Sequence, residues 1–318
     1  MSEQTIGELL RFPVAPPTYE GRLLNYPVHA GVELEFSNAE TILPAYGLSL
    51  WTIDTDNSIR GQHPRELAFD GALSPHIAEK AILALPGMGL EKFEVNDTCG
   101  FHVHVDVRDL TVAELRNVLF LYLVVERTLY RYCGAGREAS NFCVPLNRTL
   151  SDVLAPFLRS EVPDIPNNMR YCGLNLAAVR KFGSIEFRMH PATKVITDII
   201  TWVNMCSAIK VRGREHHPAK DIYKRCLMEP KGFLRSVFGD LSDLLYVGEG
   251  TKEDLLAGLL DAKDSYLYED AHRADRVLRT SKSRSKSEFP FDTWKKAAAR
   301  AATDVGSPRI SLLNGREY

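Results

Sequence analysis

Three segments of the chain alternate apolar and polar residues so strictly that each predicts a strand with one core face. They are Gly31–Phe36 (GVELEF), Phe101–Val107 (FHVHVDV) and Ile185–His190 (IEFRMH). Successive side chains of a strand point to opposite faces, so each apolar set must pack on a core. The opposite faces carry two glutamates, two histidines, and a glutamate followed by an arginine. The pattern predicts an α+β fold, in which an antiparallel sheet has helices on its apolar face.

The remaining elements are predicted from capping signals and periodicity. Shorter strands are expected over Trp51–Asp54 and Glu66–Phe69, and Arg170–Val179 is expected to begin as a strand. Ser74 is a candidate N-cap, and Thr111 and Glu114 form a capping box. Helices are predicted near Thr5–Arg11, over Ser74–Leu85, from Thr111 to Tyr132, over Ile196–Val211 and over Phe291–Ala302.

Composition excludes several classes of protein. Of 318 residues, 45% are hydrophobic and 25% are charged, as in ordinary globular chains. Lys and Arg number 39 against 41 Asp and Glu, so no basic field favours a nucleic-acid partner. The six cysteines form no CxxC pair and are expected to be reduced, buried thiols in a cytoplasmic protein. The apolar run Val118–Val125 is too short to span a membrane, so no membrane partner is expected.

The polar faces predict a site that binds metal ions. Side chains two residues apart on a strand lie about 6–7 Å apart on one face, so neighbouring strands would gather these groups. Crowded carboxylates repel one another unless cations lie between them, and their oxygens suit Mg²⁺ or Mn²⁺. Arg188 has no acceptor atom, so it cannot bind a metal, but it can bind phosphate. Divalent ions with an arginine are typical of phosphoryl transfer.

Each pair taken alone is more typical of a solvated strand face or a cross-strand ion pair. The joint pattern, with every pair opposite an unbroken apolar face, favours a site. His190 and the pair His216–His217 are expected on the surface or in loops.

Five motifs follow one another in an order that resembles the amidoligase family. They are GVELEF (31–36), WTIDTDNS (51–58) followed by Glu66–Leu67, TCGFHVHV (98–105), RYCGLNL (170–176) and IEFR (185–188). This family is a branch of the glutamine synthetase and glutamate–cysteine ligase superfamily. The resemblance covers residues from about 30 to 210. It implies a glutamine synthetase-like sheet and an ATP-dependent carboxylate–amine ligase that forms an amide through an acyl phosphate, with Mg²⁺ or Mn²⁺.

The resemblance also implies roles for individual residues. The implied metal ligands are Glu33, Glu35, Glu66, His102 and Glu186. His104 would lie near the phosphates of ATP, and Arg188 would neutralise the phosphate in the transition state. Arg170 and Asn175 would orient the phosphate or the acyl group. The partners would be small-molecule or peptide carboxylates and amines, and the chain is compatible with an oligomer.

The sequence pattern and the extent of the resemblance predict three parts of the chain. Residues 1–30 are rich in proline and are predicted to form an N-terminal arm, residues 31–220 the catalytic domain, and residues 221–318 a helical extension with a basic linker over 280–287.

Two other functions remain open from the sequence. A His-x-His pair with a glutamate also suits a zinc hydrolase, although acids outnumber histidines and no His-Glu-x-x-His is present. The other alternative is a non-catalytic binding or assembly protein on a ligase-like fold.

Overall fold

Six strands in the described part of the chain form one sheet in which every pair of neighbours is antiparallel. The computed structural model describes residues 4–39, 50–69, 73–148, 167–215, 222, 225–226 and 229–262. The sheet order is β2-β3-β1-β4-β6-β5. The strands are β1 (Ala30–Phe36), β2 (Trp51–Asp54), β3 (Arg65–Phe69), β4 (Gly100–Asp106), β5 (Leu174–Asn175) and β6 (Ser184–Pro191). The α+β class is confirmed.

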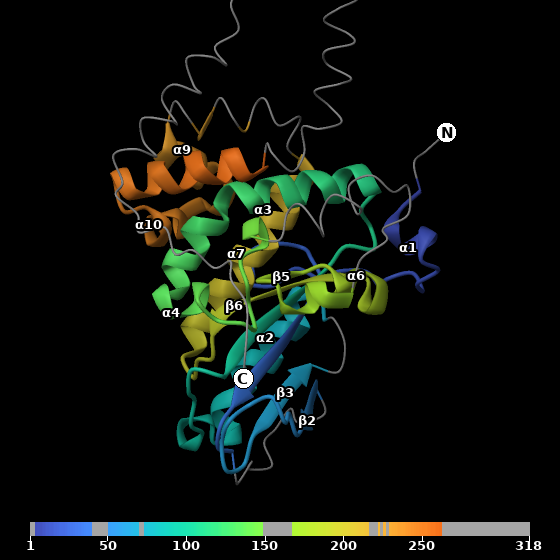
Figure 1. Cartoon of the computed structure of the whole chain (residues 1–318). Helices are drawn as coiled ribbons and strands as arrows, with labels where there is room; N and C mark the ends of the chain where they lie inside the picture. Colours follow the sequence, from blue (N-terminus) through green and yellow to red (C-terminus); the bar gives the residue numbers. More distant parts are fainter. Residues whose placement is uncertain are drawn as a thin grey trace, which may run out of the picture. The chain divides into compact units, whose positions relative to one another are not determined.

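Helices pack on the apolar face of this sheet (Figure 1). The α-helices are α1 (Ile6–Leu9), α2 (Pro75–Ala84), α3 (Val112–Cys133), α4 (Ala135–Glu138), α6 (Ala177–Phe182), α7 (Ile196–Glu215), α9 (Pro230–Phe238) and α10 (Ser242–Leu245). Residues 249–262 are also helical. The 3-10 helices are η2 (Leu85–Met88), η3 (Leu90–Lys92), η4 (Leu146–Arg148), η6 (Asn167–Tyr171) and η7 (Gly239–Leu241).

The two long helices build the core with β4 and β6. α3 packs on β6 and on α7, and α7 packs on β4. The predicted capping box at the start of α3 is confirmed. The Glu114 N–H donates to Thr111 Oγ1, and the Thr111 N–H donates to Glu114 Oε2. Tyr122 of α3 meets Phe187 of β6 edge to face, with ring centroids 5.8 Å apart. The predicted apolar strand faces are therefore the faces that the helices bury.

Two sequence-based expectations need correction or qualification, and three others fall on residues that the structure does not describe. Arg170 lies in the 3-10 helix η6, and the strand begins only at Leu174. Ser74 occupies the N-cap of α2 as predicted, but its hydroxyl makes no capping hydrogen bond. The 280–287 linker, the Phe291–Ala302 helix and the His216–His217 pair lie outside the described residues.

The prediction for His190 is wrong because β6 contains a bulge. His190 is only 6% exposed and packs against Phe101, Tyr132 and Trp202. Strict alternation would place it beside Arg188 on the polar face. One extra residue in β6 breaks that alternation and turns His190 into the core. Burial lowers the pKa of its imidazole to about 4.

Two general expectations can be compared with the described residues. All six cysteines are buried and free, as predicted. None of the helices in the described ranges has the length and apolar character needed to cross a bilayer.

A buried carboxyl on α3 ties this helix to η4. Glu126 is fully buried, and it accepts hydrogen bonds from the Tyr122 hydroxyl (2.9 Å) and from the backbone N–H groups of Leu146 (2.6 Å) and Asn147 (3.1 Å). Burial raises the pKa of Glu126 to about 7, although these three donors oppose the rise.

This raised pKa predicts a pH dependence of stability. Folding favours the protonated form of Glu126, so its stabilising contribution is complete below its usual pKa and is lost as the pH rises through about 7. Relative to Glu126→Gln, the wild type should therefore lose about 3 kcal/mol of unfolding free energy between about pH 4.5 and 7.5. Urea unfolding of both proteins across this range measures the difference. The exposed Glu138→Gln serves as the control, and parallel pH profiles for wild type and Glu126→Gln would contradict the prediction.

Candidate functional site

The strand register brings the predicted polar pairs together on one face of the sheet. Glu33 lies opposite His102 across β1 and β4, and Glu35 lies opposite Glu66 across β1 and β3. His104 lies opposite Glu186 across β4 and β6. Antiparallel neighbours hold directly opposed side chains within contact distance, so residues of four strands form one cluster.

The first group of donor atoms in this cluster consists of Glu33, His104 and Glu186, with one ligand atom of each within 4.8 Å of the others. His104 Nε2 lies 3.1 Å from Glu33 Oε1 and 3.9 Å from Glu186 Oε2. The atom is buried and makes no aligned hydrogen bond. The other ring nitrogen, Nδ1, is 2.9 Å from the Ser184 hydroxyl. An imidazole nitrogen left unsatisfied beside two carboxylates fits a metal ligand.

The second group consists of Glu35, Asp56 and Glu66, whose ligand atoms also lie within 4.8 Å of one another. The sequence predicted Glu35 and Glu66 as metal ligands but not Asp56, which lies in the loop between β2 and β3. The signal was present, because Asp56 belongs to the WTIDTDNS motif. All donors in this group are carboxylate oxygens, which suits a hard cation such as Mg²⁺.

His102 lies between the two groups and contacts carboxylates of both. Its Nδ1 is 3.3 Å from Glu33 Oε2 and 3.5 Å from Glu186 Oε1. Its Nε2 is 3.6 Å from Glu35 Oε1. The imidazole is 3% exposed, so these contacts are made away from water. The spacing of donor atoms thus groups His104, rather than the sequence-predicted ligand His102, with Glu33 and Glu186.

The pKa shifts of the first group follow from its mixture of charges. Burial alone would raise the pKa of Glu33, but the two imidazoles lower it well below the usual range. Burial likewise opposes ionisation of Glu186, yet the charges of His104 and Arg188 lower its pKa. The pKa of His104 is raised by Glu33 and Glu186 despite its burial.

Glu66 behaves differently because anions surround it. Burial and the charges of Glu33, Glu35 and Asp56 raise its pKa to about 7. Carboxylates crowded in this way repel one another, and a cation bound between them would relieve that repulsion. The donor set therefore fits divalent cations in both groups.

Hydrogen bonds around the cluster hold its carboxylates in place. Asn175 Nδ2 donates to Glu186 Oε2 at 2.6 Å, and Arg188 Nη1 donates to Glu186 Oε1. The backbone N–H of Gly100 donates to Glu35 Oε2. A Cβ at Gly100 would lie 2.5 Å from His102 Nε2, so a larger residue there would displace the His102 ring.

Arg170 lies apart from the cluster. Its side chain is exposed on η6, with the guanidinium 5.0 Å from the ring centroid of Tyr171. Within the described ranges it contacts none of the cluster residues. The structure therefore gathers all the predicted site residues except this one.

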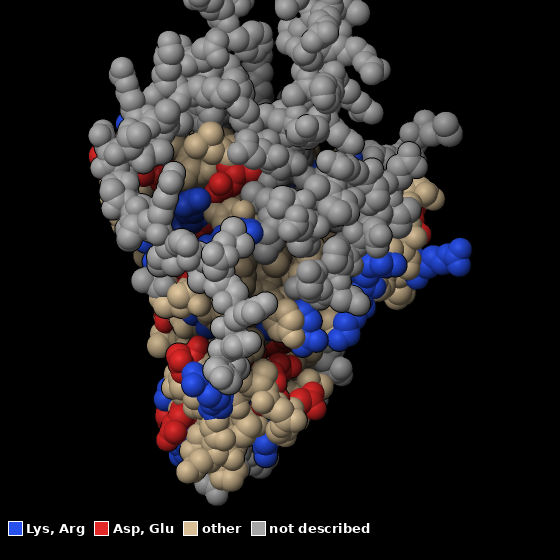
Figure 2. Space-filling view, viewed as in Figure 1, with Lys and Arg blue, Asp and Glu red and all other residues tan. Residues whose placement is uncertain are grey.

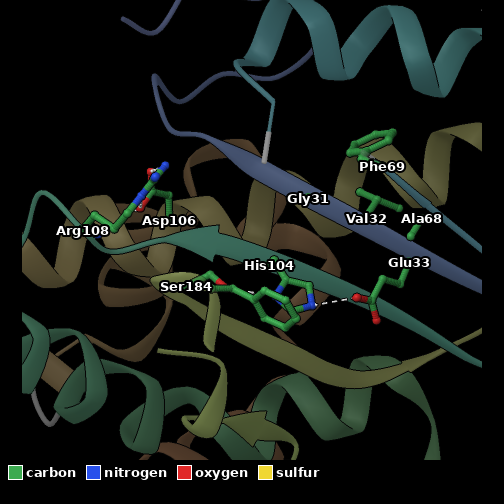
Figure 3. A pocket seen from close by; sticks show the side chains of 10 residues that line it. Gly31, Val32, Glu33, Ala68, Phe69, His104, Asp106, Arg108 and Ser184 are labelled. Carbon is green, nitrogen blue, oxygen red and sulfur yellow. Dashed lines mark hydrogen bonds and ion pairs between the residues drawn. The ribbon is translucent and has the colours of Figure 1, made fainter. Parts of the chain in front are cut away.

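A cavity of about 330 Å³ opens beside Glu33 and His104 (Figure 3). In this view Asp106 and Arg108 lie at the end away from Glu33, joined by hydrogen bonds of 2.8 and 2.9 Å. Phe182 meets His104 edge to face with centroids 5.5 Å apart. The cavity lining consists of Gly31, Val32, Glu33, Ala68, Phe69, His104, Asp106, Arg108, Phe182 and Ser184. Its volume is within the usual range for small-molecule sites.

Charges of both signs occur on the face of the molecule that Figure 2 shows. On the face shown in Figure 2, acidic and basic side chains are interspersed around the lower part of the molecule. This agrees with the formal net charge of −2. Local groups, rather than a global field, must therefore select the ligand.

An antiparallel sheet that carries carboxylates, imidazoles and a guanidinium on one face defines a candidate metal-assisted enzyme. Residues 90–210 match the model of the family described as "Putative amidoligase enzyme". This match supports the resemblance to the amidoligase family that the sequence predicted, and with it an enzyme of the ligase class. The matched segment contains His102, His104, Glu186 and Arg188, whereas β1 and β3 lie outside it. No curated protein matches the chain.

Proposed function

We propose that the protein is an ATP-dependent carboxylate–amine ligase with a glutamine synthetase-like active-site sheet. The observation that carries this proposal is the pair of donor groups, Glu33–His104–Glu186 and Glu35–Asp56–Glu66, flanked by Arg188 and by a cavity. Two adjacent cation sites with an arginine suit phosphoryl transfer to a carboxylate.

The two donor groups would hold Mg²⁺ or Mn²⁺. Bound there, these ions would reduce the repulsion between an anionic triphosphate and an anionic carboxylate. His102, in contact with carboxylates of both groups, would fix the spacing between them. The hydrogen bonds to Glu186 and Glu35 supply the rigid support that such ligands require.

We expect ATP to bind in this cavity. His104 lies on its wall, so the phosphates would approach the cluster from there while the nucleoside extends toward Asp106 and Arg108. The remaining wall includes the aromatic side chains Phe69 and Phe182, which suit a base. The described residues that line the cavity include no glycine-rich phosphate loop, so the phosphates would depend on the cluster for binding.

The reaction would then proceed in two transfers. A carboxylate oxygen of the acyl substrate attacks the γ-phosphorus, and the bond to ADP breaks. The amine nitrogen next attacks the acyl carbon, phosphate leaves, and the amine loses a proton. Arg188 would stabilise negative charge on the phosphoryl group during the first transfer, and Asn175 would keep Glu186 oriented. Arg170 is still proposed to orient the acyl group or the phosphate, although it lies apart from the cluster, over the Tyr171 ring.

Thermal unfolding with nucleotide and metal tests this function. Mg²⁺ together with a non-hydrolysable ATP analogue should raise the melting temperature, because ligands that bind only the folded state stabilise it. Mg²⁺ alone and the analogue alone are the controls, and each should have a smaller effect. Stabilisation by stoichiometric Zn²⁺ without any effect of the nucleotide would contradict the ligase and indicate a zinc hydrolase. No response to either would favour a binding or assembly protein.

A further inference from the structure

The β6 strand is irregular at the residue that the proposed reaction needs most. Phe101 pairs with His190 and Val103 pairs with Phe187, so Arg188 and Met189 together lie opposite His102. Bulges of this kind redirect side chains and are common beside active sites. Such an irregularity persists only if other groups satisfy the backbone that the ladder leaves unpaired.

The side chain of Arg137, at α4, satisfies that backbone. Its Nε donates to the carbonyl of Met189 at 3.0 Å, and its Nη2 donates to the carbonyl of Arg188 at 3.0 Å. Arg137 is 8% exposed, and within the described part of the chain it forms no ion pair. Burying a guanidinium costs free energy unless it is hydrogen-bonded. The hydrogen bonds that offset the burial of this charge therefore go to the carbonyls of the two bulged residues.

The segment that carries Arg137 also holds the side chain of Arg188. The carbonyl of Phe142 accepts a hydrogen bond from Arg188 Nε at 3.4 Å. This segment is fastened to α3, because the Tyr130 hydroxyl donates to the Cys143 carbonyl and Glu126 accepts from Leu146 N–H. This stretch of chain therefore holds Arg188 at its backbone carbonyl and at Nε, while the Arg188 N–H donates to the Gly173 carbonyl at 2.7 Å.

We propose that Arg137 is a positioning residue that fixes the β6 bulge and thereby aims the Arg188 guanidinium at Glu186 and the transferred phosphate. The proposal rests on the proposed function for the role of Arg188. The orientation of Arg188, however, can be measured without any nucleotide.

The first test observes Arg188 directly by NMR. Its Nε–H resonance is identified by its disappearance in Arg188→Lys. In Arg137→Lys and Arg137→Gln this proton should shift and exchange with water about tenfold faster, the change expected when one net hydrogen bond is lost. The matched control is Arg148→Lys, since Arg148 lies in the same region but pairs with Glu138 on the surface.

Two outcomes would overturn the proposal at this stage. One is an Arg188 resonance that both Arg137 variants leave unchanged. The other is failure of both variants to fold, which would show that Arg137 maintains the whole fold rather than the direction of one side chain.

The second test separates ground-state from transition-state binding. Aluminium fluoride with Mg²⁺ and ADP imitates a phosphoryl group in transfer. Arg137→Lys should weaken this complex about tenfold or more, because small misplacements of a reacting group are costly. Binding of Mg²⁺ and ADP alone should change less than about twofold. Equal losses in both complexes would overturn the positioning role. If the wild type binds neither complex, the proposed function fails, while the resonance of Arg188 still decides the role of Arg137.

Discussion

Glu33→Gln is expected to abolish Mg²⁺-dependent binding of an ATP analogue. Glu33 contacts both His102 and His104, and its low pKa keeps it ionised at neutral pH. An amide of the same size removes the charge and leaves a weaker metal ligand. Altering even an outer partner of a metal site typically costs 10–100-fold, so the loss for a direct ligand should be about 100-fold or more. Isothermal titration of the analogue in the presence of Mg²⁺ measures it.

The exposed Glu91 on η3 supplies a matched control, since Glu91→Gln removes the same charge away from the cluster. In the presence of Mg²⁺, the affinity of Glu91→Gln for the ATP analogue should equal that of the wild type. Both variants should fold, because Glu33 is partly exposed and makes no backbone hydrogen bond through its side chain among the described residues. If Glu33→Gln retained wild-type affinity, Glu33 would not be a metal ligand and the first donor group would have to be abandoned.

Arg188→Ala is expected to lower turnover about 10²–10³-fold, the range typical of removing a donor that stabilises transition-state charge. Its guanidinium pairs with Glu186 and, lacking acceptor atoms, is not a metal ligand. Binding of Mg²⁺ and the ATP analogue should therefore change much less than turnover. Steady-state release of ADP at saturating Mg²⁺ and ATP gives turnover, and titration gives the affinity.

Arg188→Lys sharpens this experiment, because it keeps the charge but loses the planar fork of donors. Partial recovery relative to Arg188→Ala is expected. The interpretation fails if Arg188→Ala weakens binding and turnover by the same factor, because Arg188 would then hold the ground state and the transition state equally.

The alternation of side chains predicted most of the site. A period of two residues assigns each side chain of a strand to one face, so Glu33, Glu35, His102, His104 and Glu186 could be placed on a common surface once their strands were neighbours. Sequence also located the capping box of α3, because Thr111 and Glu114 interact within one helical turn.

The positions of Asp56 and His190 could not be predicted from the alternation of side chains. Asp56 reaches Glu35 and Glu66 from a loop, and no periodicity predicts the path of a loop. His190 follows the extra residue of β6, and an insertion of one residue reverses the face of every side chain after it. Neither outcome depends on the residue type at that position.

Local chemistry along the chain was therefore sufficient for the strands, their polar and apolar faces and the amidoligase resemblance, because those features depend on neighbours in sequence. The register of the sheet, the bulge beside Arg188 and the burial of Arg137 and Glu126 arose only when distant segments packed. Their positions depend on hydrogen bonds and desolvation between residues many positions apart, such as the bonds from Arg137 to the carbonyls of Arg188 and Met189.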